Sequence, residues 1–457
     1  MDLYVVILAA GKGTRMRSSI PKVLHPLANK PLLLHVIEKA QSMRPQKTIV
    51  VYGHGGETVK EHLAATGVEW VEQVTQLGTG HAVMQAMHLI PDNARVMILY
   101  GDVPLTRTET LQALLNCDKS HNDSIALLTA TLDDPTGYGR IIRDHEFNVT
   151  HIVEQKDANE SELEVNEVNT GILVASSHCL RHWLDNISND NAQAEYYLTD
   201  IIAMAVSEEF GVATVSAETV WEILGVNDKK QLAELERHLQ LTIAKSLLKE
   251  GVTLRDPARI DVRGTLTVSR DCEIDINCLF EGDVVLEEGV RIGANCHLKD
   301  VTVGRSTIIH PFSSVDSSTI AEECEIGPYA RIRPDTTLAS KVKIGNFVET
   351  KKATIGENSK VNHLSYIGDT VIGKRVNIGA GTITCNYDGA NKHQTMIGDD
   401  VFVGSDTQLV APVTIGNGAT IGAGSTITKD APVDELTLSR SKQISVPSWK
   451  RPVKKSK

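Results

Sequence analysis

Aliphatic side chains recur at six-residue steps through the second half of the chain, from about Ile274 to Ile427. They are Ile274, Leu286, Ile292, Leu298, Ile326, Ile332, Leu338, Ile344, Ile355, Val361, Ile367, Ile397, Val403, Leu409, Ile415, Ile421 and Ile427. This period fits neither the roughly 3.6-residue repeat of a helix nor the two-residue alternation of a strand. It predicts a parallel β-helix in which each hexad forms one side of a triangular coil. An ordinary β-sandwich would show turn signals only every 8 to about 12 residues.

The first half has a different pattern, in which short apolar runs alternate with helical stretches. The runs are Tyr4–Leu8, Thr48–Tyr52 and Val96–Tyr100, and the helical stretches lie near 31–41 and 80–89. Continuous apolar runs are typical of strands that are buried on both faces of a mostly parallel sheet. The alternation therefore predicts an α/β fold with a doubly wound, Rossmann-like sheet, whose ligand site lies beyond the carboxyl ends of the strands.

Between the two halves, leucine and isoleucine recur at steps of three and four residues among charged residues. This pattern predicts a helix from Asp228 to about Glu250, with Gly251 as its C-cap. At ~1.5 Å per residue such a helix reaches about 30 Å. A helix packed wholly on the first domain is the alternative. We therefore expect domains at 1–227 and 251–457, joined by a helical linker at 228–250.

Length, charge and cysteine usage narrow the class of protein. The 457 residues exceed what one core usually supports. A net charge of −12 disfavours nucleic acid or an anionic membrane as a partner. No apolar run approaches the ~18 residues of a membrane span, and the N-terminus does not look like a secretory signal. The seven cysteines include no C-x-x-C pair, so we expect neither zinc nor disulfides, and a cytoplasmic location.

A glycine-rich segment follows the first predicted strand. It contains Gly11 and Gly13, and it is followed by Arg15 and by Lys22. Glycines allow backbone N–H groups to surround a phosphate, and the two cations can follow a polyphosphate. Met16 stands where a Rossmann fingerprint would need its third glycine, so the segment is a different phosphate-binding loop.

Two further polar residues fit a nucleotide site. Asp102 follows the strand at 96–100, where a carboxylate can hold Mg²⁺ beside a phosphate. A turn or capping aspartate is the alternative. Gln73 precedes Gln76-Leu77-Gly78-Thr79, and its amide offers a donor and an acceptor that complement the edge of uracil. A solvated loop glutamine is the other interpretation, and the spacing alone does not exclude it.

The predicted solenoid carries exceptions to its regular repeat. Polar and charged residues that a coil stack does not need fall within about four coils. They are Arg333, Lys351, His363, Tyr366 and Asn377. The period breaks between Ile378 and Ile397, and the segment 384–391 predicts a projecting loop. Loops on a rigid solenoid commonly carry function.

Together these features resemble a known family. The Gly-rich opening, Lys22 and Tyr100-Gly101-Asp102 are similar to sugar-1-phosphate nucleotidyltransferases. With the C-terminal hexapeptide solenoid, the whole chain resembles the bacterial bifunctional N-acetylglucosamine-1-phosphate uridylyltransferases / glucosamine-1-phosphate N-acetyltransferases. The resemblance implies an enzyme that acetylates glucosamine 1-phosphate from acetyl-CoA and then transfers UMP from UTP, releasing pyrophosphate. Its product, UDP-N-acetylglucosamine, supplies peptidoglycan and lipopolysaccharide. The implied solenoid is a left-handed parallel β-helix.

The resemblance implies roles for residues of the first half. Arg15 and Lys22 would be catalytic, and Asp102 and Asn227 would hold Mg²⁺. Asn227 reads from spacing alone only as a helix N-terminal signal. The implied UTP and UDP-sugar site comprises Leu8, Ala9, Ala10, Gly11, Lys22, Gln73, Gly78, Thr79, Tyr100, Gly101, Asp102, Gly139, Glu154, Asn169 and Asn227. Of these, Gly139, Glu154 and Asn169 would bind the N-acetylated sugar.

For the second half, the resemblance implies that His363 is the general base of acetyl transfer, a task that suits neutral imidazole. Arg333, Lys351, Tyr366 and Asn377 would bind glucosamine 1-phosphate. The implied acetyl-CoA site comprises Ala380, Asn386, Tyr387, Ser405, Ala423 and Arg440. The family also implies a homotrimer with sites between neighbouring solenoids.

Two other classes of function are compatible with parts of the pattern. One is a sugar-1-phosphate nucleotidyltransferase whose β-helix is purely structural or regulatory. Such a protein would not require His363, Lys351 and the 386–387 loop together. The other is a non-catalytic scaffold, which would have no use for Arg15, Lys22 and Asp102 in one domain.

Overall fold

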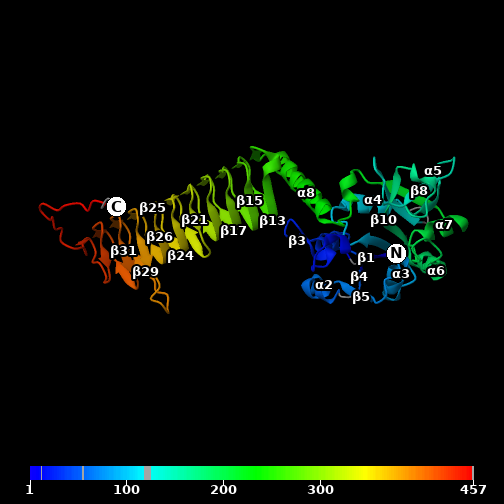
Figure 1. Cartoon of the computed structure of the whole chain (residues 1–457), viewed down its shortest axis with the longest axis horizontal. Helices are drawn as coiled ribbons and strands as arrows, with labels where there is room; N and C mark the ends of the chain where they lie inside the picture. The colour runs from blue at the N-terminus through cyan, green and yellow to red at the C-terminus, as the bar shows by residue number, and fades with distance from the viewer. Residues whose placement is uncertain (12, 54–55, 118–124, 455–457) are drawn as a thin grey trace. The chain divides into compact units, whose positions relative to one another are not determined.

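The computed structural model describes residues 1–11, 13–53, 56–117 and 125–454. The chain divides into two compact units, Met1–Leu239 and Gln240–Lys457, whose elements are labelled in Figure 1. The division falls inside the helix expected at 228–250. The exact domain bounds given above stay a prediction.

Unit 1 is built on a nine-stranded sheet, and the three predicted strands are confirmed in it. They are β1 (Asp2–Ala9), β4 (Lys47–Gly53) and β6 (Ala94–Tyr100), and both β4 and β6 pair in parallel with β1. The main path runs β11-β7-β10-β6-β1-β4-β5. Its other strands are β5 (Glu69–Gln73), β7 (Ile125–Thr131), β10 (Glu167–Ser176) and β11 (Val212–Ser216), with β8 (Arg140–Arg143) and β9 (Val149–Val153) beside β10. Strand β10 is antiparallel to β6 and β7, so the sheet is mixed.

Helices cover both faces of this sheet, which confirms the doubly wound arrangement. One face packs against α1 (Leu32–Ser42), α2 (Glu57–His62) and α4 (Thr108–Asn116), and the other against α3 (Thr79–Ala86), α6 (Ser177–Asn186) and α7 (Asp200–Ser207). A short helix, α5 (Glu160–Leu163), follows β9. Because β1 lies between β4 and β6, the strand order reverses there. Such a reversal leaves a crevice beyond the strand ends.

The predicted linker helix is α8 (Lys229–Lys249), followed by Gly251 at a φ of 91°. Its first half packs on unit 1, where Leu235 joins a cluster with Met16 and Leu32. In its second half, Ala244 and Leu247 belong to the core of the solenoid. The alternative in which the helix packs wholly on the first domain is therefore wrong. Among the described residues, no helix is long and apolar enough to cross a membrane.

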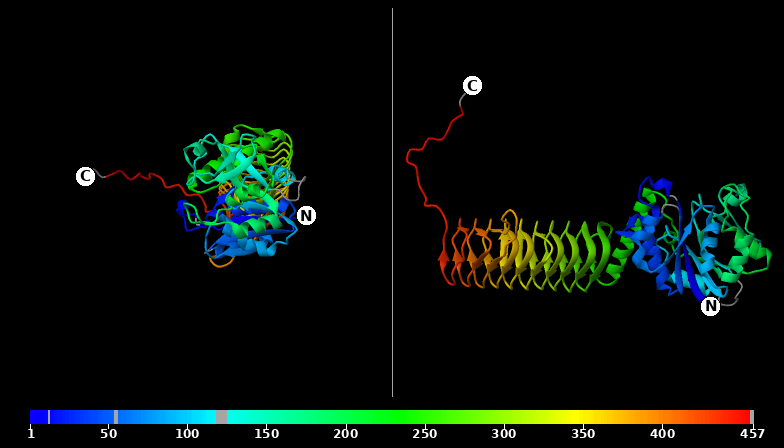
Figure 2. Two further views of the ribbon diagram at one scale, coloured as in Figure 1. Left: turned by 90° about the vertical axis from the view of Figure 1, so that its right-hand side faces the viewer. Right: turned by 90° about the horizontal axis from the view of Figure 1, so that it is seen from below.

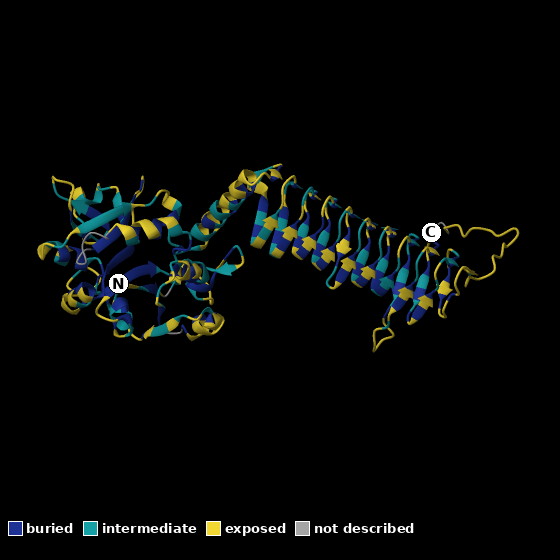
Figure 3. Cartoon of the chain, turned by 180° about the vertical axis from the view of Figure 1, so that it is seen from behind, coloured by how far each residue is buried: buried dark blue, intermediate teal, exposed yellow. Residues whose placement is uncertain are grey.

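Unit 2 is a parallel β-helix, as the six-residue period predicts, and Figure 2 shows its coils stacked in sequence order. Aligned aliphatic residues lie 17 or 18 positions apart in most coils, for example Ile274, Ile292 and Ile309, and 25 apart between Ile378 and Val403. These residues are buried, as the dark blue parts of the strands in Figure 3 show, and their side chains fill the interior. No single coil can bury this ladder alone, so the stacking itself stabilises the unit.

The coils form two sheets. Sheet C has β12 (Thr253–Leu254), β14 (Glu273–Ile274), β16 (Arg291–Ile292), β18 (Ile308–Ile309), β20 (Glu325–Ile326), β23 (Lys343–Asn346), β25 (Lys360–His363), β27 (Asn377–Ile378), β30 (Phe402–Val403), β33 (Thr420–Ile421) and β35 (Leu436–Thr437). Sheet D has β13 (Ile260–Val268), β15 (Cys278–Leu286), β17 (His297–Val303), β19 (Ser314–Ile320), β21 (Arg331–Ile332), β22 (Thr336–Leu338), β24 (Glu349–Ile355), β26 (Tyr366–Ile372), β28 (Ile383–Cys385), β29 (Thr395–Ile397), β31 (Gln408–Val410), β32 (Val413–Ile415) and β34 (Thr426–Ile427).

One corner of the coil, between sheets C and D, carries a column of residues with positive φ. In successive coils this corner column consists of Phe312, Tyr329, Phe347, Leu364, Gly381, Asp406 and Gly424. The three aromatic rings stack, with centroids 5.0 and 5.3 Å apart. Bulky side chains rarely adopt this conformation. Beyond Leu364 the corner column consists of glycine or aspartate, so small side chains replace bulky ones at this corner in the last coils.

The seven cysteines are all free, as expected. Burial raises the pKa of Cys278 to about 11 and that of Cys296 to about 12. We expect a maleimide at neutral pH to modify exposed Cys117 in the native protein, and Cys278 and Cys296 only in denaturant, because the reaction needs both a thiolate and access to it. Peptide mass spectrometry measures this order. Native labelling of Cys296 as fast as that of Cys117 would contradict it.

Candidate active sites

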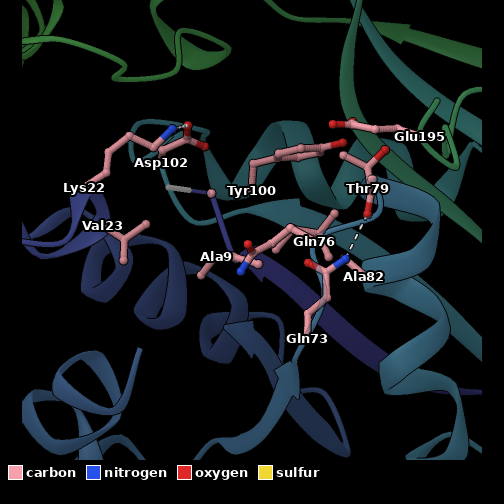
Figure 4. Close-up of a pocket in the computed structure, with 14 residues that line it drawn as sticks. Ala9, Lys22, Val23, Gln73, Gln76, Thr79, Ala82, Tyr100, Asp102 and Glu195 are labelled. Atoms are coloured by element: carbon pink, nitrogen blue, oxygen red, sulfur yellow. Dashed lines mark hydrogen bonds and ion pairs between the residues drawn. The ribbon is translucent and has the colours of Figure 1, made fainter. Parts of the chain in front are cut away.

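A pocket of about 460 Å³ opens where β1 and β6 end (Figure 4). It is lined by Leu8, Ala9, Ala10, Gly11, Lys22, Val23, Gln73, Gln76, Gly78, Thr79, Ala82, Tyr100, Asp102 and Glu195. Ten residues of the expected nucleotide site are among them. They come from four separate stretches of sequence that the parallel sheet gathers at one edge.

The register of the central strands explains this gathering. Leu8 of β1 pairs with Tyr100 of β6, so the segments that follow both strands begin at the same level. The Gly101 N–H donates to the Leu8 carbonyl at 2.9 Å. Gly13 has a φ of 60°, and a Cβ there would lie 2.6 Å from Cβ of Lys22. A glycine at this position therefore allows Lys22 to approach the loop.

Lys22 links the two expected metal ligands. Its ammonium donates to Asp102 Oδ2 at 2.5 Å and to Asn227 Oδ1 at 3.2 Å. Asn227 is held by its own N–H, which donates to Gln231 Oε1, and the neighbouring Val226 N–H donates to the Asp102 carbonyl. A residue that spacing could not single out is thus placed beside Asp102 by the start of α8.

This pair of oxygens fits a divalent metal. A carboxylate and a carboxamide oxygen are hard donors, and they already converge on one cation, the Lys22 ammonium. A hard divalent ion bound at a nucleotide site commonly uses only one or two protein oxygens, and phosphates and water complete its coordination. Asp102 and Asn227 are the residues that would hold such an ion.

Gln73 is almost fully buried, with 2% of its surface exposed, so the solvated alternative is wrong. Its amide nitrogen bonds to the Gly78 carbonyl at 3.1 Å and to His81 Nδ1 at 3.0 Å. The donor half of the amide is therefore engaged within the protein. Its oxygen is the group that remains to accept a hydrogen bond from a base.

The three residues expected to bind the N-acetylated sugar lie together. The Asn169 N–H donates to the Gly139 carbonyl at 2.9 Å, and a Cβ at Gly139 would lie 3.4 Å from both carboxylate oxygens of Glu154. Burial raises the pKa of Glu154, to which Asp200 and Asp157 add repulsion. Burial also raises the pKa of Tyr100, with further contributions from Glu154 and Asp102. Tyr100 thus lies beside both the pocket and the residues that are expected to bind the sugar.

Arg15 is not brought into the pocket. It lies exposed on the 3-10 turn Thr14–Met16, so its catalytic role stays a prediction. Conversely, Glu195 lines the pocket and was not found from the sequence. It follows a polar segment without a motif, and only the tertiary contact of that segment with the 77–80 turn reveals it.

In the solenoid, five of the eleven expected acetyl-transfer residues form a second column beside the corner column. Asn346 pairs with His363 in the next coil, and Ala380, Ser405, Ala423 and Arg440 follow in successive coils. His363 Nδ1 contacts Asn346 Oδ1 at 3.0 Å. Because a carboxamide oxygen only accepts hydrogen bonds, this contact favours the neutral tautomer in which Nδ1 carries the proton and Nε2 has the lone pair. Asn346 was missed, although counting one coil back from His363 would have found it.

A cluster of cations lies on sheet D. Contact with Lys392, and then the charge of Arg333, lower the pKa of Lys351. Arg333 also donates to Glu349 Oε1 at 2.7 Å. Because cations that repel one another need an anion to offset them, the cluster fits a phosphate. Lys392 was missed, and its signal is a basic residue in the segment that breaks the repeat.

The predicted projecting loop is confirmed between β28 and β29, and Figure 3 shows it leaving the coils. Asp388 organises it by accepting from the N–H groups of Ala390 and Asn391 and from His393, which together lower its pKa. At the base of the loop, Asn386 donates to Asp369 at 2.5 Å, while the Tyr387 side chain is exposed. The loop therefore holds Lys392 and Tyr387 in a defined shape.

One chain does not bring all these residues to one place. Asn377 lies on the outer face of β27 in sheet C, paired with Lys360 and Phe402. Tyr366 and Lys351 belong to strands of sheet D. The expected substrate residues thus face different sides of the coil.

Family models match both halves of the chain. A MobA-like NTP transferase domain matches residues 5–252. A GMPPB C-terminal domain matches 262–348 and 325–411, and a bacterial transferase hexapeptide model of six repeats matches 394–429. A solved structure of a UDP-glucose pyrophosphorylase complexed with UDP-glucose covers 52% of this chain and 98% of its own, at 16% identity and a TM-score of 0.43, which is too weak to add to the assignment.

Curated relatives match along the whole chain. "Bifunctional protein GlmU" of Janthinobacterium sp. (strain Marseille) is 58% identical over 454 residues, which is 99% of both chains. The protein of the same name from Nitrosospira multiformis is 58% identical over 456 residues, and that from Ralstonia pickettii is 57% identical over 455. The chain belongs to the GlmU family. It is a bifunctional transferase with uridylyltransferase and acetyltransferase activities in UDP-N-acetylglucosamine synthesis, and a divalent metal serves the first activity. The interpretation of the solenoid as purely structural is therefore wrong.

Proposed function

We propose that the pocket at the end of β1 and β6 carries out uridylyl transfer, and that the column from His363 to Arg440 with the sheet D cations carries out acetyl transfer. The observation that supports the first assignment most strongly is the convergence of Lys22, Asp102 and Asn227 beside the Gly-rich loop. The second is supported by His363, whose Asn346 contact leaves one ring nitrogen as an acceptor.

In uridylyl transfer, a phosphate oxygen of N-acetylglucosamine 1-phosphate attacks the α-phosphorus of UTP. A bond forms between that oxygen and the phosphorus, while the bond from the phosphorus to the pyrophosphate oxygen breaks. No side-chain nucleophile is needed, because positioning and charge neutralisation provide the rate. The Gln73 oxygen accepts from the base, Lys22 neutralises phosphate charge, and Gly139, Glu154 and Asn169 bind the sugar.

The metal is Mg²⁺ in this proposal, and Asp102 and Asn227 are the residues that would hold it. A bound Mg²⁺ would supply positive charge that offsets the charge of the phosphate oxygens. The hard oxygen donors of the pair support this choice over a softer ion.

In acetyl transfer, Arg333, Lys351 and Lys392 bind the phosphate of glucosamine 1-phosphate. His363 Nε2 takes a proton as the amine nitrogen attacks the thioester carbon, and the C–S bond then breaks to release CoA. Asn346 fixes the tautomer that makes this possible. Ala380, Asn386, Tyr387, Ser405, Ala423 and Arg440 bind acetyl-CoA, and a backbone N–H near Ala380 can stabilise the oxyanion.

The assembly is a homotrimer in this proposal, because the substrate residues of one chain face different sides of the coil and need a neighbour to complete the site. Its location is the cytoplasm, which the seven free cysteines support since a reducing compartment keeps thiols free.

We expect His363→Ala to reduce acetyl transfer by about 10²- to 10⁴-fold, the usual contribution of a general base, while UMP transfer stays near normal. Release of CoA thiol and of pyrophosphate measures the two activities on one preparation. Asp102→Ala is the matched control, and it should lose only UMP transfer. Equal loss of both activities in a folded variant would argue against separate sites.

We expect Lys22→Met to bind Mn²⁺ more tightly than the wild type when no nucleotide is present. The Lys22 ammonium contacts both metal-binding oxygens, and its removal frees them. The gain should be at least about tenfold, or ~1.4 kcal/mol. Electron paramagnetic resonance of free Mn²⁺ measures it, and Lys30→Met, at an exposed ion pair with Glu38, is the control. Unchanged or weaker binding would show that Lys22 does not cover the ligand pair.

Light scattering coupled to size-exclusion chromatography measures the mass of the assembly. If the 49.7 kDa chain forms a trimer, the measured mass should be three times that of the chain. A monomer that keeps full acetyl transfer would refute the shared site.

A further inference from the structure

Arg140 is a buried cation that forms no ion pair with a described residue. Its side chain is only 2% exposed and is among the largest fully buried ones in the described part of the chain. Its charge contributes to lowering the pKa of the exposed Asp134, but no carboxylate of the described residues lies within ion-pair distance, and its Nε has no hydrogen-bond partner. Burying an unpaired guanidinium costs free energy, so arginine is rarely fully buried unless it is paired. Its position at the start of β8 therefore needs another reason.

The hydrogen bonds of Arg140 tie the turn before β8 to the turn after β9. Nη1 donates to the Tyr138 carbonyl, and Nη2 donates to Gln155 Oε1 at 2.9 Å. The same Gln155 oxygen accepts from the Gly137 N–H at 3.1 Å. Arg140 and Gln155 thus form a clamp that holds residues 137 and 138 against residue 155. We call this pair the turn clamp.

The turn clamp flanks the residues that face the sugar. Gly139 lies between Tyr138 and Arg140, and Glu154 directly precedes Gln155. A Cβ at Gly139 would be 3.4 Å from the Glu154 carboxylate, and the Gly139 carbonyl accepts from Asn169. The hydrogen bonds of Arg140 and Gln155 are made to each other, to the Tyr138 carbonyl and to the Gly137 N–H. The clamp therefore reaches Gly139 and Glu154 through their chain neighbours.

We propose that Arg140 and Gln155 are positioning residues that set the spacing of Gly139 and Glu154, and thereby the affinity and specificity for the N-acetylated sugar 1-phosphate. A planar guanidinium can serve two acceptors in fixed directions, which a lysine ammonium cannot do at one position. A single ångström of misplacement at a binding site can change rates strongly. This inference rests on the sugar site proposed above.

The test compares steady-state UMP transfer by Arg140→Lys, Gln155→Leu and Gln155→Glu. Arg140→Lys and Gln155→Leu should raise KM for N-acetylglucosamine 1-phosphate by about tenfold or more and leave KM for UTP within about twofold. Both variants should also lose part of the preference for N-acetylglucosamine 1-phosphate over glucose 1-phosphate. Gln155→Glu keeps an acceptor oxygen and should retain most of the affinity. Acetyl transfer by the same chains should be unchanged, which verifies folding of unit 2.

Two control variants separate the possible results. Arg143→Lys is matched, because Arg143 lies on the same strand but pairs with Glu167 at 2.7 Å, and it should leave the sugar KM unchanged. Glu154→Ala tests the sugar site directly. If Glu154→Ala leaves the sugar KM unchanged, the proposed sugar site is wrong. The positioning role is overturned if Glu154→Ala raises the KM for the sugar phosphate and Arg140→Lys does not. It is also overturned if Arg140→Lys raises the KM for the sugar phosphate and the KM for UTP equally and lowers the melting temperature.

Discussion

The burial of one aliphatic ladder determines the arrangement of the whole solenoid. Residues such as Ile274, Ile292 and Ile309 must stack inside, because a coil that shifted by one position would turn its apolar side chains to water. Once the inward positions are fixed, every outward position is fixed as well, at an interval of 17 or 18 residues in most coils and of 25 at the coil that carries the loop. His363 therefore stands directly beside Asn346 and Ala380 although no local contact along the chain requires it. The chemistry of unit 2 depends on the same register as its stability.

A comparable constraint acts in unit 1. The parallel pairing of β1 with both β4 and β6 buries three apolar runs and ends them at one edge. The polar segments that follow have no apolar ladder of their own, and their positions are inherited from the strands. Lys22 and Asp102 meet for this reason. Hydrogen bonds within the protein then fix the orientation of side chains at this edge. The amide nitrogen of Gln73, which contacts the Gly78 carbonyl and His81 Nδ1, is an example.

The regular parts of the fold could be predicted from the sequence because their signals are periodic. The hexad period gave the coils, the apolar runs gave β1, β4 and β6, and leucine spacing gave α8. The residues that no local pattern singles out are those positioned by contacts between distant segments. Asn227 approaches Lys22 across 205 positions, and Arg140 reaches Gln155 through a turn and a strand pairing. Arg15 differs from them, since its role was expected from a motif position alone, and its exposed side chain does not line the pocket, so that role stays a prediction. The roles of these residues rest on geometry that no local pattern records.

In the acetyl-transfer site proposed above, the column from His363 to Arg440 would also determine the length of the ligand that binds. It advances by four coils through Ala380, Ser405 and Ala423. Adjacent strands lie about 4.8 Å apart, so it spans on the order of 19 Å. An extended ligand that carries a thioester at one end and phosphates at the other would fit along this column, with its thioester at the imidazole of His363 and its phosphates at the guanidinium of Arg440. The number of coils beyond the base, and not the shape of a closed cavity, would then set the length of ligand that fits. Beyond Leu364, Gly381 and Gly424 replace the bulky side chains of the corner column, which leaves the column from His363 to Arg440 accessible to such a ligand.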